Sequence, residues 1–329
     1  MVNIYQALSA LLLMLSSISY AQHDGAISGG ECSPNSLQSP KLEGMWVKGE
    51  LSGFDPCHSS VIFKLPTNIK HPPLLIAVHG GGGRRDVENI TNEFSKNGMA
   101  TLIFDAYQLN GFGNRKRFGN ASRQMMLLKI AYQAYEWALK RKDININRIY
   151  FYGISNGASV VLNLAGMVSP ENVKGIFSEA PTPVGIGYPW EIKVPVEIAF
   201  GQLDDLGAKL GQKRWMISDP CRFVGKFLFA PPGTADECNN QNSSNKMLTT
   251  LEWVEKISLG GGNRIRVSYF DGVAHGAFIG PLTIQTAQEF ATKRGFNMST
   301  DMGWSEGGTD EGRAALMKSA LAFFKVNSK

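Results

Sequence analysis

Histidine and cysteine are scarce in this sequence, with five and four copies among 329 residues. They form no C-x-x-C or H-E-x-x-H motif and no His/Cys cluster, so a zinc site is not expected. The net charge is +5, from 33 basic and 28 acidic side chains. A balance this close to neutral over a chain of this length does not favour nucleic-acid binding, and we expect no nucleic-acid partner.

A long hydrophobic run is also missing. The apolar stretch from Ala7 to Leu15 is shorter than the roughly 18–20 residues that a membrane span requires. Residues 1–21 carry no charged side chain, and Ser19 and Ala21 place small residues at the −3 and −1 positions of a cleavage site. We interpret 1–21 as a secretory signal peptide. The mature protein is then predicted to be secreted or periplasmic, without stable membrane insertion after cleavage.

All four cysteines follow the predicted cleavage site and would therefore lie in an oxidising compartment. Four cysteines allow three connectivities, among which a sequence cannot choose. We favour the local pairs, Cys32 with Cys57 and Cys221 with Cys238. The alternative is that they are buried free thiols.

The chain divides into an irregular N-terminal extension, 22–60, and one large domain, 61–329. The extension is rich in Gly, Ser and Pro, whereas short apolar runs alternate with helical patterns in the domain. This alternation predicts an α/β fold, in which a mostly parallel sheet has helices on both faces. The alternation begins at 61. Strands are expected at 74–78, 100–104, 149–152, 174–177, 194–200 and 265–270, and helices at 86–96, 121–141, 159–167, 244–257 and 312–326.

A Gly-Ile-Ser-Asn-Gly sequence at 153–157 stands between an expected strand and an expected helix. Small residues on both sides of Ser155 permit the sharp, strained turn that exposes a nucleophilic serine at the end of a strand. The alternative is a tight turn whose serine has no catalytic role. The position between strand and helix favours the nucleophile.

A serine hydroxyl needs a histidine to take its proton and a carboxylate to orient that histidine. In α/β-hydrolases these partners follow the serine in the order acid, then histidine. His275 is the only histidine after Ser155, and it directly follows the strand expected at 265–270. The acid is expected after the strand at 194–200, where Asp204 and Asp205 are both candidates.

Acyl transfer also requires donors for the developing oxyanion. One is expected to be the backbone N–H of Asn156, directly after the nucleophile. The second is expected in the His-Gly-Gly-Gly-Gly turn at 79–83, where we choose Gly81, with Gly82 next. A phosphate cradle is disfavoured because the turn lacks the Gly-Lys-Ser/Thr of a P-loop. His79 precedes the serine and is expected to order this turn.

Taken together, these motifs resemble the dienelactone hydrolase family of α/β-hydrolases over about 61–280. The resemblance implies an α/β-hydrolase fold. It also implies that Asp204 is the acid, because the family's acid lies in a G-x-x-D turn. The type enzyme carries a cysteine nucleophile where this sequence has Ser155. The matching features are the turn at 79–81, Gly98, the segment 104–107, the serine turn, Gly201-x-x-Asp204, and 271–278.

The interval from Asp204 to His275 is longer than a compact family member needs. The extra chain, about 206–242, holds Cys221 and Cys238 together with several large apolar side chains. We predict a disulfide-containing lid over a hydrophobic ester. The alternative is an insert that simply packs onto the domain.

These features predict a secreted carboxylesterase-like serine hydrolase. Ser155 attacks the ester, His275 moves the proton, Asp204 orients His275, and the N–H groups of Gly81 and Asn156 hold the oxyanion. Such a reaction needs no cofactor, and we expect none. The expected substrate is a small-molecule or polymer-linked ester. The alternatives are a serine peptidase of the same fold and a non-catalytic binding protein on a hydrolase scaffold.

Overall fold

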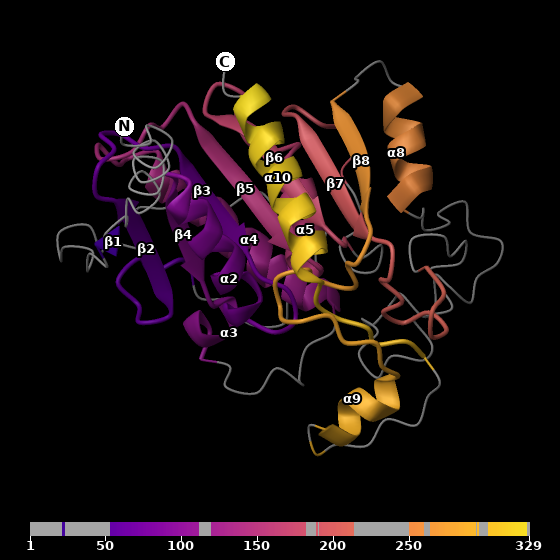
Figure 1. The fold of residues 1–329 in the computed structure, drawn as a ribbon. Helices are drawn as coiled ribbons and strands as arrows, with labels where there is room; N and C mark the ends of the chain where they lie inside the picture. Colours follow the sequence, from indigo (N-terminus) through magenta and orange to yellow (C-terminus); the bar gives the residue numbers. More distant parts are fainter. Residues whose placement is uncertain are drawn as a thin grey trace, which may run out of the picture.

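The fold is a mixed α/β arrangement around one eight-stranded sheet (Figure 1). The computed structural model describes residues 22–23, 53–111, 120–181, 189, 191–213, 250–259, 264–293, 295 and 302–327. The strand order is β1-β2-β4-β3-β5-β6-β7-β8. The strands are β1 (Gln22–His23), β2 (Val61–Pro66), β3 (Leu74–Val78), β4 (Ala100–Phe104), β5 (Ile149–Ile154), β6 (Val173–Glu179), β7 (Val196–Gly201) and β8 (Ile265–Phe270).

The sheet is parallel from β4 to β8, whereas β2 runs antiparallel to both β1 and β4. This confirms the predicted α/β class with a mostly parallel sheet. The described helices are α2 (Arg85–Lys96), α3 (Ala106–Leu109), α4 (Asn120–Ala138), α5 (Asn156–Leu164), α8 (Thr250–Leu259), α9 (Ala287–Lys293) and α10 (Asp310–Val326). Within the described residues, no helix combines the length and the apolar character that crossing a membrane would require.

Side chains that alternate along the central strands build a hydrophobic core on each face of the sheet. In β3, Leu74, Ile76 and Val78 belong to one cluster, and Leu75 and Ala77 belong to the other. All five are fully buried, which explains why this strand is a continuous apolar run in the sequence.

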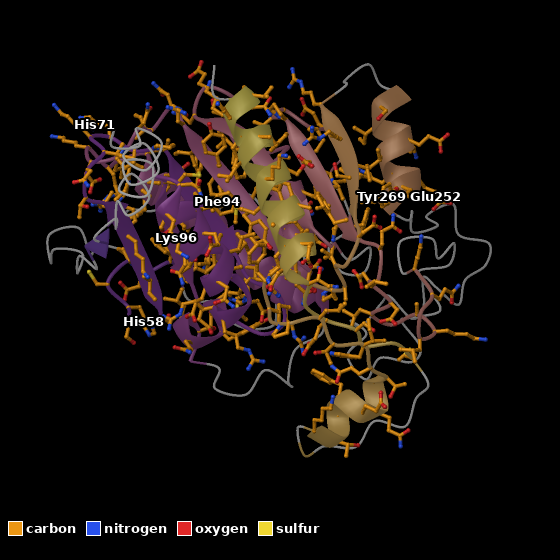
Figure 2. The ribbon with its side chains drawn as sticks, viewed as in Figure 1. His58, His71, Phe94, Lys96, Glu252 and Tyr269 are labelled. Atoms are coloured by element: carbon orange, nitrogen blue, oxygen red, sulfur yellow. The ribbon has the colours of Figure 1, made fainter. Side chains whose placement is uncertain are left out.

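Helices from opposite sides of the sheet close the two clusters. Side chains of α4 and α5 lie in the first cluster, and side chains of α2 and α10 lie in the second. Phe94 of α2, labelled beside α10 in Figure 2, packs against Phe324 of α10 with ring centroids 5.6 Å apart. The predicted placement of helices on both faces is confirmed.

The carboxyl ends of the parallel strands β5 to β8 meet at one edge of the sheet. The serine, acid and histidine segments all follow these strands, so the topology brings the predicted site residues to this edge. Two short helices were not predicted, namely α3 and α9. A four-residue and a seven-residue helix span too few turns to show a clear helical period.

Candidate active site

Ser155 lies in a strained turn between β5 and α5. Its φ is 56° and its ψ is −118°, a left-handed backbone that a residue with a Cβ rarely adopts. A Cβ on Gly153 would lie 2.3 Å from the carbonyl oxygen of Gly157, and one on Gly157 would lie 2.1 Å from that of Val78. Gly153 is therefore required for the turn to pack against the start of α5, and Gly157 is required for it to close against β3.

The glycine-rich turn after β3 lies beside this serine. A Cβ on Gly80 would lie 3.0 Å from the Ser155 Cβ, and one on Gly81 would lie 3.9 Å from the side-chain nitrogen of Asn156. The Gln124 amide in turn donates to the Asn156 side-chain oxygen at 3.2 Å. The two backbone positions predicted to hold an oxyanion are thus brought to the serine.

His79 fixes the shape of this turn, as expected. Its ring is fully buried, and Nε2 accepts a hydrogen bond from the Ala106 N–H at 3.0 Å. Nδ1 therefore carries the proton and donates to the Gly80 carbonyl at 2.7 Å. The Gly82 N–H donates to Asp86 at 2.7 Å, which favours Gly81 over Gly82 as the oxyanion donor.

His275 and Asp204 form a buried pair at the same edge. The distance from His275 Nδ1 to Asp204 Oδ2 is 3.1 Å, and the residues are 6% and 0% exposed. Their loops are joined by a backbone hydrogen bond of 2.9 Å from Leu203 to Val273. A Cβ on Gly201 would lie 2.4 Å from the Val273 carbonyl oxygen, so the G-x-x-D turn needs its glycine for this close approach.

Asp205 points to other partners. It accepts hydrogen bonds from the Ser305 N–H at 2.9 Å, the Ser305 hydroxyl at 3.1 Å and the Gly211 N–H at 2.8 Å. This aspartate therefore ties the acid turn to the segment before α10. Of the two candidates for the acid, Asp204 is the one that the structure places beside His275.

Glu179 is a buried carboxylate at this edge that the sequence analysis did not select. It ends β6, is 1% exposed and accepts a hydrogen bond from the Ala277 N–H at 2.6 Å and another from the Tyr152 hydroxyl. Burial raises the pKa of Glu179, whereas these two hydrogen bonds and the nearby His275 lower it. The strand also contains Lys174 and Ser178, so one more polar residue at its end gave no clear sequence signal.

Burial and the neighbouring Glu179 carboxylate raise the pKa of Tyr152 well above its ordinary value of 10.0. Tyr152 is therefore a neutral hydroxyl that donates its proton to Glu179.

The arginine nearest the candidate oxyanion donor was also missed. Arg84 and Arg85 follow the glycine turn, but Arg84 pairs with Glu88 at 2.7 Å and Arg85 is largely exposed. Instead, Arg123 of α4 places Nη1 3.9 Å from the position of a Cβ on Gly81. Its place within a long helix gave no sequence signal.

Three of the four cysteines and most of the predicted lid lie outside the described residues. Cys57 is not a free thiol, but Cys32, Cys221 and Cys238 are not described. Of the predicted lid at 206–242, only 206–213 is described. Both pairings and the lid therefore stay predictions, as does the signal peptide at 1–21.

No protein-family model matches the sequence, and no curated protein is significantly similar to it. Solved structures with a similar fold include proteins described as dienelactone hydrolases and esterases. A dienelactone hydrolase-like promiscuous phosphotriesterase from metagenomic libraries is 11% identical, with a TM-score of 0.48, over 81% of this chain and 92% of its own. Esterase 2 of Thermogutta terrifontis, phosphoramylated by tabun, is 12% identical, with a TM-score of 0.46, over 81% and 88%.

A dienelactone hydrolase from Anabaena variabilis is 14% identical, with a TM-score of 0.37, over 65% of this chain and 81% of its own. These similarities are too low to assign a family. The functional conclusion therefore depends on the residues of the site.

Proposed function

We propose that this protein is an exported serine hydrolase with an α/β-hydrolase fold that cleaves carboxylic esters. The observation that carries the proposal is the left-handed backbone of Ser155, packed against the Gly80 turn and held at the sheet edge that also presents His275 and Asp204. Backbone strain of this kind is retained where it serves a function. A serine in an ordinary turn would not need it.

The tautomer of His275 follows from its partner. Asp204 accepts a hydrogen bond from Nδ1, so Nδ1 carries the proton and Nε2 is left to act as a base toward Ser155. In the proposed reaction, the Ser155 oxygen attacks the ester carbonyl while Nε2 takes the hydroxyl proton. The Asp204 carboxylate stabilises the imidazolium that results.

The negative oxygen of the tetrahedral intermediate is held by the N–H groups of Gly81 and Asn156. The imidazolium then gives its proton to the leaving alcohol, and the acyl group remains on Ser155. Water, deprotonated by His275, releases the acid and restores the serine. The proposed substrates are small to medium carboxylic esters, free or linked to a polymer.

Ester hydrolysis by matched serine variants tests the proposal. The wild type is expected to cleave p-nitrophenyl esters of graded acyl length, and S155A is expected to lose at least about 1000-fold in kcat. S159A is the control, because Ser159 is buried one turn further along α5. Equal esterase activity in S155A and S159A would overturn the proposal, and cleavage of a peptide in place of every ester would favour a peptidase.

A further inference from the structure

Glu179 lies at the centre of the candidate site but has no part in the steps above. It is the last residue of β6, which lies between β5 and β7 in the sheet (Figure 1). Its backbone carbonyl accepts a hydrogen bond of 3.0 Å from the Ser155 N–H. The next residue, Ala180, has a φ of 50°, and its N–H donates at 2.8 Å to Ala199 of β7. The backbone here thus connects the serine turn to the strand that precedes the acid.

The side chain of Glu179 reaches the histidine loop. One oxygen accepts the N–H of Ala277, two residues beyond His275, at 2.6 Å. The other accepts the hydroxyl of Tyr152 in β5. Ala277 and Tyr152 are both fully buried, so water does not compete for either hydrogen bond. This carboxylate therefore holds the loop that carries His275 in a fixed position relative to β5, the strand that leads into the serine turn.

Donors on both oxygens favour the ionised form of Glu179 and oppose the rise in its pKa that burial causes. The titratable groups around it are Tyr152 from β5, Asp204 after β7 and His275 after β8, and Asp86 of α2 acts on the Tyr152 hydroxyl. The nearby His275 lowers the pKa of Glu179, so the two side chains interact in a buried site where screening is weak.

We propose that Glu179 is a positioning residue that holds the His275 loop through Ala277 and supports the imidazolium as a second carboxylate in addition to Asp204. The catalytic role of Glu179 in this inference rests on the proposed function. The coupling between the Glu179 charge and the His275 ring can be measured without any substrate.

The test compares two buried glutamates. In E179Q the amide oxygen still accepts the Ala277 N–H, and the amide nitrogen donates to the Tyr152 oxygen, so the main change is the loss of charge. E197Q is the matched control, because Glu197 is fully buried in the neighbouring strand β7 but is bonded to Arg266, Ser268 and Ser319. Titration of the His275 ring is followed by NMR in each protein, with H275Q used to assign the signal.

The titration of the His275 ring is expected to move to lower pH by roughly one unit in E179Q and to stay within about 0.2 units in E197Q. The acid limb of the kcat/KM profile is expected to move in the same direction. Should E179Q fail to fold, Y152F serves in its place. It removes one donor to Glu179 and is expected to move the titration in the same direction by a smaller amount.

An unchanged titration in E179Q, or in the Y152F substitute, overturns the inference. If the wild type cleaves no ester but the ring titration moves, the proposed function fails and the coupling stands. If esters are cleaved but the titration does not move, the proposed function stands and the coupling between Glu179 and His275 fails. The two failures are therefore distinguishable.

Discussion

The glycine after the nucleophile turn gives the sharpest prediction about geometry. In G157A the new methyl group would lie 2.1 Å from the carbonyl oxygen of Val78 and 2.6 Å from that of His79. Ordinary contact requires more than 3 Å, so the end of β3 or the start of α5 must retreat by about 1 Å. Both clashing atoms are backbone, so no side chain can rotate away.

That displacement separates the Gly81 turn from Ser155. A misplacement of about 1 Å costs about 100-fold in rate, and overpacking of this kind costs about 1–3 kcal/mol of folding free energy. We therefore expect kcat/KM for a p-nitrophenyl ester to fall about 100-fold in G157A, with a loss of stability measurable by urea denaturation. G280A is the control, because no atom lies within 4 Å of its added methyl group.

The two assays separate displacement of the Gly81 turn from unfolding of the protein. Circular dichroism first shows that the variant is folded, and the kinetics are then measured on that folded protein. If G157A keeps its activity within about threefold of G280A, the close approach of β3 and α5 does not position the site, and the geometric argument is wrong.

Three further predictions concern the carboxylates. D204N is expected to lower kcat about 10,000-fold at neutral pH, because an amide can hold His275 in the wrong tautomer, as measured by ester hydrolysis. D205N is expected instead to lower the unfolding midpoint while kcat falls less than tenfold, because Asp205 bonds Ser305; the reverse result would exchange their roles. The pKa of Glu179 is raised by burial, so its folded form holds a proton above its ordinary value of 4.5. The contribution of Glu179 to folding stability is present below pH 4.5 and is lost as the pH rises through its raised pKa. Over this pH range the free energy of unfolding in urea should therefore fall in the wild type relative to E179Q. A constant difference between the two proteins at every pH would refute this prediction.

The sequence predicted the central strands well because they are buried on both faces of the sheet. The five residues of β3 are all fully buried, and a strand without a solvent face is a continuous apolar run that is easy to recognise. The serine turn was recognisable for a related reason. Its geometry tolerates only glycine at 153 and 157, so the physical constraint is visible as residue identity.

The remaining features depend on contacts between distant segments. Asp204 and Asp205 are adjacent in sequence, and contacts with distant segments separate their roles. Asp204 contacts His275, 71 residues away, whereas Asp205 contacts Ser305, 100 residues away. Glu179 and Arg123 were missed because a strand end and a helix face do not reveal what packs against them. The helix α9 was missed because its seven residues show no clear period.

Covalent labelling with a fluorophosphonate, followed by peptide mapping in a mass spectrometer, tests the central claim most directly. The account predicts one label per chain, attached to the Ser155 oxygen. The label should form in S159A, should be absent from S155A, and should form much more slowly in H275Q. A label on another residue, or equal labelling of S155A and the wild type, would contradict it.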